Sequence, residues 1–277
     1  MNPPSVSAPE SSARSTGQHA PPVRRFALLR HSLALAGRNL IKIRRNPISI
    51  SDAVIAPVMF LVIFVYMVGG AVSGSSDAYL QRTLPAVLVL AAIMAGMIAT
   101  GVNLSIDIKK GIFDRFRSLP ISRSAPLIGS VLADVVRYVV AIATVLAFGT
   151  LIGFRVQTDP FSALAAVALT VVFGMSLSWL WVLLGVVIKE TAVVQSIVAL
   201  SIFPLAFGTD MVAPLDTLPG WLQAWADINP VQATMAACRG LLVGGDAGHH
   251  VVTSVLWSLG LVVVLAPLAV AAYRRRT

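Results

Sequence analysis

The feature that most constrains this chain is a series of six long intervals without any Asp, Glu, Lys or Arg residue, at 53–76, 83–106, 138–154, 160–188, 191–209 and 251–273. A helix needs roughly 20 apolar residues to cross the hydrocarbon core of a bilayer. We therefore predict six membrane-spanning helices, at about 51–72, 84–106, 127–154, 161–188, 191–210 and 251–273. Together they make residues 48–277 one transmembrane domain.

The continuous apolar character of these intervals also decides the fold class. Strands of a membrane β-barrel alternate polar and apolar side chains over about 10 residues, which these intervals do not. Within lipid the backbone must satisfy its own hydrogen bonds, and a helix does so within one segment. We predict an all-α integral membrane protein.

Composition excludes the common soluble classes of protein. Hydrophobic residues make up 57% of the 277 residues and charged residues 12%, whereas soluble domains carry about 25% charged residues. So few charges cannot cover a water-facing surface, which excludes an ordinary soluble enzyme. The single cysteine, Cys238, excludes a disulfide scaffold and a cysteine-based metal cluster.

The net charge of +9 would suggest a nucleic-acid partner in a soluble protein, but here its distribution decides its meaning. If the N-terminus is cytoplasmic, 17 of the 21 Lys and Arg residues face the cytoplasm, and Arg82, Arg155 and Arg239 lie outside. Cytoplasmic loops carry an excess of Lys and Arg. We predict that the protein is a multi-pass membrane protein with both termini cytoplasmic and that it binds no nucleic acid. The excess of 17 Arg over 4 Lys, with abundant Ala and Val, favours a bacterial host and hence a bacterial plasma membrane.

Residues 24–47 predict an amphipathic helix that lies in the membrane interface. Apolar residues recur every three or four positions along one face: Phe26, Leu29, Leu33, Ala36, Leu40 and Ile43. Basic residues cluster on roughly the opposite face, where they would meet anionic headgroups. The helix is either a membrane anchor or a lever that also touches a cytosolic partner. Residues 1–23 are polar and lack a signal-peptide core, and we predict a disordered cytoplasmic tail.

The segment between the second and third predicted spans, residues 107–123, has a pattern of its own. Its apolar residues share one face of a short helix: Ile108, Ile112, Phe116 and Leu119. Asp107 stands at the start, where a carboxylate favours the positive end of the helix dipole, and Pro120 ends the helix. The alternative is a basic loop that only fixes topology. Such a loop would not need the two aromatic residues, Phe113 and Phe116, or the glycine at 111.

Six residues of this segment follow the pattern D-x-x-x-G-x-x-x-R-x-R-x-L-P: Asp107, Gly111, Arg115, Arg117, Leu119 and Pro120. A second pattern, late in the chain, is Asn229-Pro230 followed by Arg239-Gly240. With these motifs and the six-span arrangement, residues 24–277 resemble the permease subunits of type-2 ABC exporters, in their daunorubicin/doxorubicin-resistance-like branch.

The resemblance implies a separately encoded ATP-binding subunit and a second permease, as a homodimer or a heterodimer. It implies an ATPase-coupling helix made of Asp107, Gly111, Phe113, Arg115, Phe116, Arg117 and Pro120. ATP and Mg would sit on the partner subunit, and this chain would hold no cofactor. The sequence agrees, because it contains no G-x-x-x-x-G-K-[ST] motif and no lysine that follows a glycine. We predict that the chain is not itself an enzyme.

Two charged residues, Asp134 and Arg137, fall within the third predicted span. Their i, i+3 spacing places them on one side of a helix, where they can pair. Charges inside a membrane are costly and usually face a bundle interior or water. The pair is either a structural pair near the cytoplasmic interface or part of a cytoplasmic gate or entry path.

The loop between the fifth and sixth spans is too long for a tight turn, and residues 216–243 predict two short helices on, or dipping into, the outer face. Trp221 and Trp225 stand at i, i+4, as in an aromatic belt at the membrane interface. By resemblance these helices, with Asn229, Pro230, Arg239 and Gly240, would cap the exit path; the alternative is a passive interfacial loop. His249 and His250 have no acidic partners at metal spacing, so we predict no metal site.

The predicted spans contain few polar residues, which suits a hydrophobic or amphipathic substrate such as a drug, an antibiotic or a lipid-like molecule. The leading hypothesis is therefore the permease subunit of an ATP-driven exporter. The alternative is a proton-coupled secondary multidrug transporter that uses Asp134, although such proteins usually have internal repeats and more intramembrane acids. A membrane enzyme would need a cluster of His, Asp or Glu, which the sequence lacks.

Overall fold

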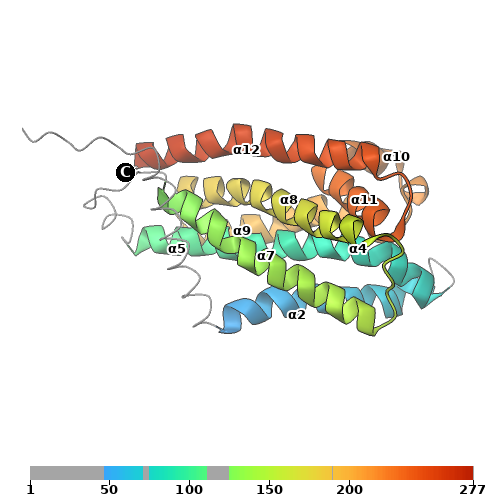
Figure 1. Ribbon diagram of the computed structural model, residues 1–277. Helices are drawn as coiled ribbons and strands as arrows, with labels where there is room; N and C mark the ends of the chain where they lie inside the picture. The colour runs from blue at the N-terminus through green and yellow to red at the C-terminus, as the bar shows by residue number, and fades with distance from the viewer. Residues whose placement is uncertain (1–46, 71–74, 111–124, 189, 277) are drawn as a thin grey trace, which may run out of the picture.

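The computed structural model describes residues 47–70, 75–110, 125–188 and 190–276, and every regular element in these ranges is helical (Figure 1). The elements in chain order are α2 (Pro47–Ile63), η1 (Phe64–Val68), α4 (Ser76–Gly96), η2 (Met97–Val102), α5 (Asn103–Lys109), α7 (Ala125–Leu151), α8 (Pro160–Val187), α9 (Thr191–Ile202), η3 (Phe203–Phe207), η4 (Leu215–Thr217), α10 (Gly220–Ile228), α11 (Pro230–Val243) and α12 (Gly248–Arg276). Segments η1, η2 and η3 are π-helical, and η4 is a 3₁₀ turn.

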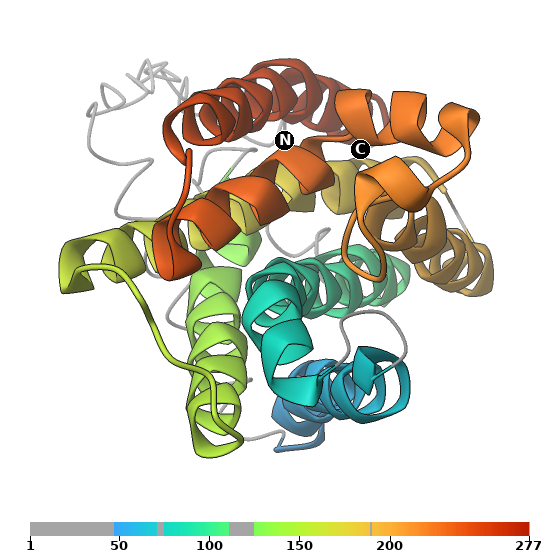
Figure 2. The ribbon, with the colours of Figure 1, turned by 90° about the vertical axis from the view of Figure 1, so that its right-hand side faces the viewer.

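The long helices run side by side, so the bundle has two distinct ends (Figure 1). Helices α5 and α12 finish at one end, which we call the C-terminal end. Helices α10 and α11 lie at the other end, where Figure 2 looks straight at them. We call it the α10–α11 end. The predicted tail 1–23 and nearly all of the predicted interfacial helix 24–47 lie outside the described residues, and Pro47 begins α2.

Within the described ranges, four helices are long and apolar enough to cross a bilayer: Ser76–Lys109, Leu127–Leu151, Pro160–Val187 and Gly248–Tyr273. They correspond to the second, third, fourth and sixth predicted spans. The first and fifth correspond to shorter apolar helices, Ile55–Val68 and Thr191–Phe207. The chain therefore has an all-helical, multi-pass character, while the number of six spans and the orientation stay predictions.

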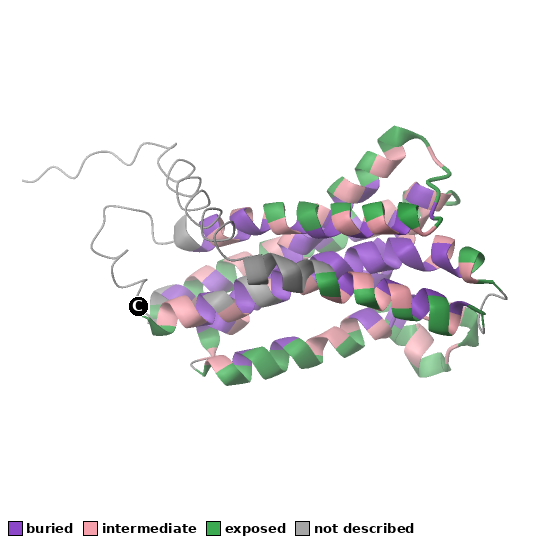
Figure 3. Cartoon of the chain, turned by 90° about the horizontal axis from the view of Figure 1, so that it is seen from below, coloured by how far each residue is buried: buried purple, intermediate pink, exposed green. Residues whose placement is uncertain are grey.

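Helix α4 occupies the centre of the bundle. An apolar 18-residue window of Ser76–Lys109, which continues α4 through η2 and α5, is 87% buried, against 11% for the window in α12. Figure 3 shows the contrast between the purple central helix and the green outer faces. From Thr83 to Ile93 every residue of α4 is buried. A helix that is apolar all round is stable only where other helices surround it, or in lipid. The sequence could not distinguish these two environments.

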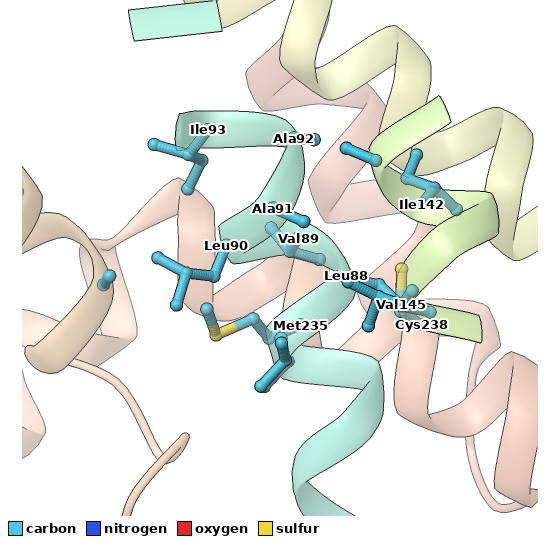
Figure 4. Close-up of a cluster of buried hydrophobic side chains, with 14 of the residues drawn as sticks. Leu88, Val89, Leu90, Ala91, Ala92, Ile93, Ile142, Val145, Met235 and Cys238 are labelled. Carbon is cyan, nitrogen blue, oxygen red and sulfur yellow. The ribbon is translucent and has the colours of Figure 1, made fainter. Parts of the chain in front are cut away.

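The main hydrophobic core joins α4, α7 and α11. Leu88 and Leu90 of α4, Val145 of α7, and Met235 and Cys238 of α11 belong to one buried cluster (Figure 4). All five side chains have at most 1% of their surface exposed. Helix α11 is therefore packed into the bundle, and it is more than a surface loop between two spans.

Helix α8 begins where Asp159 caps it and Pro160 occupies its first position. The backbone N–H of Ser162 donates to Asp159 Oδ2 at 3.0 Å, and the Ser162 hydroxyl donates to Oδ1 at 2.7 Å. These hydrogen bonds from Ser162 hold the pKa of the Asp159 carboxyl below its usual value. The charged cap fixes the start of α8 at the predicted membrane boundary.

Close packing of α8 against η2 depends on Gly185. A Cβ atom on Gly185 would lie 2.8 Å from the carbonyl oxygen of Gly101, a backbone atom that cannot turn aside. Gly185→Ala should lower the free energy of unfolding by about 1–3 kcal/mol, as overpacking does. The measurement is the thermal unfolding midpoint of the detergent-purified protein. Gly260→Ala on α12 is the matched control, because nothing lies within 4 Å of its Cβ position. Equal midpoints for the two variants would contradict this packing.

Candidate functional site

The predicted ATPase-coupling segment begins at the C-terminal end of the bundle. Asp107, which is among the residues that the structure describes, lies partly exposed in α5. The other predicted coupling residues lie outside the described residues: Gly111, Phe113, Arg115, Phe116, Arg117 and Pro120. The coupling role of the segment therefore stays a prediction.

The base of this segment is joined to the start of α9 by two polar contacts. Lys109 Nζ lies 2.9 Å from Glu190 Oε1, and the hydroxyls of Ser105 and Thr191 are 3.1 Å apart. An exposed ion pair such as Lys109–Glu190 stabilises by only about 0–1 kcal/mol. Its value here is positional, because it connects α5 with the first residues of the fifth predicted span. No pattern in the sequence predicts this ion pair, whose partners are 81 residues apart.

Asp134 and Arg137 lie on α7 and face each other as their spacing predicts. Arg137 Nη1 is 3.4 Å from Asp134 Oδ1, and both side chains are largely buried. Thr100 of η2 donates a second hydrogen bond, to Asp134 Oδ2. A buried carboxylate needs such partners, since an unpaired one is very costly to bury. The pair thus connects α7 to η2, the π-helical segment that continues α4. Such π-helical turns are frequent at functional sites.

One helical turn further along α7 than Asp134, Tyr138 makes polar contacts as well. The Tyr138 hydroxyl hydrogen-bonds the hydroxyl of Ser178 and donates to the carbonyl of Gly174 at 3.3 Å, so α7 is also tied to α8. Gly96 of α4 allows this approach, because a Cβ there would lie 2.6 Å from the Tyr138 oxygen. The sequence analysis missed Thr100 and Tyr138. The only available signal was that Tyr138 follows Asp134 at i, i+4.

At the opposite end, Trp225 and Asn229 fasten α10 and α11 to the end of the fifth predicted span. Trp225 Nε1 donates to the carbonyl of Pro204 at 2.9 Å. Asn229 Nδ2 donates to the carbonyls of Leu205, at 3.0 Å, and Gly208, at 3.3 Å. Asn229 also caps α11, because its Oδ1 accepts from the Val231 N–H at 3.0 Å. Trp221, by contrast, is 74% exposed.

Pro230 and Gly240 serve the geometry of α11. Pro230 is the first residue of the helix, where its missing N–H has no cost. Gly240 lets the turn before α12 fold closely over it, since a Cβ there would lie 2.8 Å from the Cβ of Ala247. These two of the four residues of the second sequence pattern thus have a local structural role, and their role in an exit path stays a prediction.

Arg239 belongs to a half-buried ionic cluster that the sequence analysis missed: the Asp210 side chain is buried, whereas those of Arg239 and Arg82 are 23% and 28% exposed. Both of its terminal nitrogens bond the carboxylate of Asp210, and Nη2–Oδ1 is 3.2 Å. Arg82 Nη2 lies 3.8 Å from Asp210 Oδ2. We call these three residues the Asp210 cluster. Its members come from α4, α11 and the loop after η3, so no spacing in the sequence could reveal it.

The described residues therefore form an apolar bundle with a polar zone toward each end. Among them, no three His, Cys, Asp or Glu side chains gather as metal ligands would. Charged groups inside the bundle are matched by partners from other helices, which suits an element that holds helices together or lets them change partners.

The two tryptophans of α10 provide a test of the attachment of this helix. Trp225→Phe keeps an aromatic ring but removes the N–H that reaches Pro204. We expect a loss of about 0.5–1.5 kcal/mol in the free energy of unfolding, the usual net value of one hydrogen bond. Trp221→Phe should leave stability unchanged, because that side chain is exposed. Chemical denaturation followed by intrinsic fluorescence measures both, and an equal effect at the two positions would refute the attachment.

Known proteins with similar sequences identify the family of this chain. Residues 30–243 match the model of the family described as ABC-2 type transporter. The chain is 39% identical over 272 residues to the daunorubicin resistance ABC transporter permease protein DrrB1 of Streptomyces coeruleorubidus, covering 98% of this chain and 92% of the relative. It is 28% identical over 246 residues to a probable doxorubicin resistance ABC transporter permease protein, DrrC, of Mycobacterium tuberculosis, covering 88% of each.

A more distant match is the putative transport permease ycf38 of Cyanophora paradoxa, 25% identical over 219 residues. The family model spans most of the described bundle, from before α2 to the end of α11. It therefore includes both the segment that carries the first sequence pattern and the Asp210 cluster. By this match and by its similarity to the Streptomyces permease, the chain belongs to the ABC-2 type transporter family, in the branch of the drug-resistance permeases.

Proposed function

We propose that this chain is the permease subunit of an ATP-driven exporter that moves a hydrophobic or amphipathic compound out of a bacterial cell. The observation that carries the proposal is its family membership together with close relatives named as drug-resistance permeases. The all-helical apolar bundle supports a multi-pass membrane protein. The direction of transport and the class of substrate are the parts that need experiment.

The energy would come from a separate ATP-binding subunit. The sequence has no G-x-x-x-x-G-K-[ST] motif to hold the phosphates of ATP, so we propose that ATP and Mg bind the partner. Residues 107–123 would dock there as the coupling helix. Lys109 contacts Glu190, and Ser105 contacts Thr191. Movement of the docked segment would therefore pass to α9 as well as along α5 to η2.

A permease of this kind would act as a dimer, with a second copy or with a paralogue. One argument for this is the centre of the bundle, which α4 fills with its own side chains. A path through a single copy would have to displace that helix, whereas a path between two copies would not. Apolar side chains on the outer faces support both a lipid environment and a partner permease: Ile55 and Met59 of α2, Val193 and Leu200 of α9, and Val255 and Val263 of α12 are exposed.

The substrate class follows from what lines the spans. Most polar side chains within the described spans bond their own helix or a neighbouring helix; Ser176 and Thr170, for example, donate to carbonyls four residues earlier. Few groups are left to coordinate an ion or a sugar, which would require a dense polar lining. We infer a substrate that binds through apolar contact, and we propose that α10 and α11 cap its exit.

The energy source can be tested with the purified proteins. The chain alone should hydrolyse no ATP, whereas the complex with its ATP-binding subunit should do so, faster in the presence of daunorubicin as the first probe. Arg115→Ala with Arg117→Ala should weaken subunit association about tenfold or more, because two charged contacts are lost. Arg155→Ala, an exposed arginine on the predicted outer side, is the control. ATP hydrolysis by the isolated chain would contradict a separate ATP-binding subunit as the energy source. Unchanged association in the double variant would contradict the coupling assignment.

Asp134 separates the ATP-driven exporter from the proton-driven alternative. The contacts of Asp134 with Arg137 and Thr100 favour a carboxylate that stays paired, so a protonophore should not stop ATP-driven transport in proteoliposomes. Asp134→Asn should lower export about tenfold while the amount in the membrane stays within about twofold, as expected for a functional intramembrane charge. Asp77→Asn, at the exposed start of α4, is the control. Equal loss of export and of protein would mean that the pair is only structural.

A further inference from the structure

The carboxylate of Asp210 joins three parts of the α10–α11 end. Asp210 lies just after η3, and its side chain is 8% exposed. Arg239 approaches it from α11 with both terminal nitrogens, and Arg82 approaches it from α4 at 3.8 Å. Arg239 also donates from Nε to the carbonyl of Arg82 at 3.2 Å. One arginine of α11 is thus bonded to the central helix and to the fifth predicted span at the same time.

Helix α11 is held differently on its other sides. The hydroxyl of Thr234 lies 2.7 Å from that of Ser254 of α12, and Cys238 Sγ lies 3.2 Å from the hydroxyl of Thr170 of α8. These contacts are neutral. The charged contacts of α11 among the described residues are those of the Asp210 cluster. On the side that faces α4, the backbone N–H of Asp210 also donates to Gln232 Oε1 of α11 at 2.9 Å. This side is therefore the one that carries charged contacts, which weaken most when water enters.

A buried ion pair is poorly explained as a device for stability. Apolar side chains of similar volume often stabilise a protein as well or better, because two charges must be removed from water. The attraction between such charges falls steeply when water enters, since the dielectric constant rises. An ion pair at this position would hold α11 while the carboxylate of Asp210 stays buried and would weaken once water reaches it, which is the behaviour that a movable seal requires.

The second arginine makes release of the first one feasible. Arg82 lies only at the edge of contact with Asp210, and its Nε is buried without a hydrogen-bond partner among the described residues. Arg82 therefore has donors to spare. If Arg239 moves away with α11, the carboxylate can turn to Arg82 and is never left buried and unpaired, a state that would be strongly unfavourable.

We propose that Asp210 is the positioning residue of the outer gate: bound to Arg239 it holds α11 against α4 in the closed state, and export requires the carboxylate to pass from Arg239 to Arg82. This inference rests on the proposed function of the chain as an ATP-driven permease, and it deepens that function by assigning the residues that keep the exit closed. The outer end of the path between the two copies opens only when the ionic contact between α4 and α11 within a copy is broken.

Cys238 reports on this movement without any engineered residue. It is the single cysteine of the chain, it precedes Arg239, and its side chain has no exposed surface. It packs in the cluster shared by α11, α4 and α7 (Figure 4). Separation of α11 from α4 would open that cluster. The measured quantity is the rate at which a membrane-impermeant maleimide, added on the side of α10, modifies Cys238 in membranes that contain the full complex.

In the wild-type complex we expect slow labelling without nucleotide and about tenfold faster labelling when ATP and vanadate trap the turnover state, as for a site exposed by local opening. Asp210→Asn and Arg239→Gln should label fast in both conditions. Arg82→Gln should label slowly in both, because the carboxylate then has no second partner. A purely structural brace would make the Arg82 and Arg239 variants behave alike. Asp216→Asn, an exposed acid of the same loop, should behave as wild type.

Arg239→Lys keeps the charge and loses the two-pronged contact, so its rate without nucleotide should lie between those of wild type and Arg239→Gln; it serves if Asp210→Asn does not fold. A nucleotide-free rate for Asp210→Asn equal to wild type overturns the proposal. So does a wild-type rate that trapped nucleotide leaves unchanged in a complex that hydrolyses ATP. If the chain binds no ATP-binding subunit, the proposed function fails on its own, while the nucleotide-free comparison still tests whether Asp210 holds α11.

Discussion

The burial of α4 is the constraint on which the rest of this structure depends. Residues 76–109 form one continuous helical rod through the centre of the bundle, and the other helices are arranged around it. This rod carries Arg82 near one end, Thr100 at the level of Asp134, and Lys109 near the other end. The Lys109 ion pair, the contacts of Asp134 and the Asp210 cluster therefore each include a residue of the same helix.

This arrangement gives a physical route between the two ends of the protein. A push on the segment that follows Lys109 acts on the rod directly, because packed helices transmit movement as nearly rigid bodies. The π-helical turn at η2, which holds Thr100 against Asp134, is a position where the rod could change register. At the far end the rod meets Arg239 of α11. A single central helix can thus connect the proposed ATPase-docking segment to the proposed seal of the exit path.

The sequence predicted the helices well because their physics is local. An apolar run long enough to span a bilayer forms a helix wherever it lies, and the i, i+3 spacing of Asp134 and Arg137 places them together in any helix. The remaining contacts of the site have no local signal. Thr100 reaches Asp134 across 34 residues and Asp210 reaches Arg239 across 29, and each contact exists only because packing brings separate helices together.

The sequence by itself therefore determined the membrane class, the helical fold and the family resemblance, since these follow from composition, periodicity and short motifs. The tertiary structure decided which helix is central, which charged residues are paired, and that α11 is packed into the bundle. The reason is that an apolar helix can be stable facing lipid or facing other helices. A buried charge, similarly, can take any partner that packing brings within reach, and only the three-dimensional arrangement selects one.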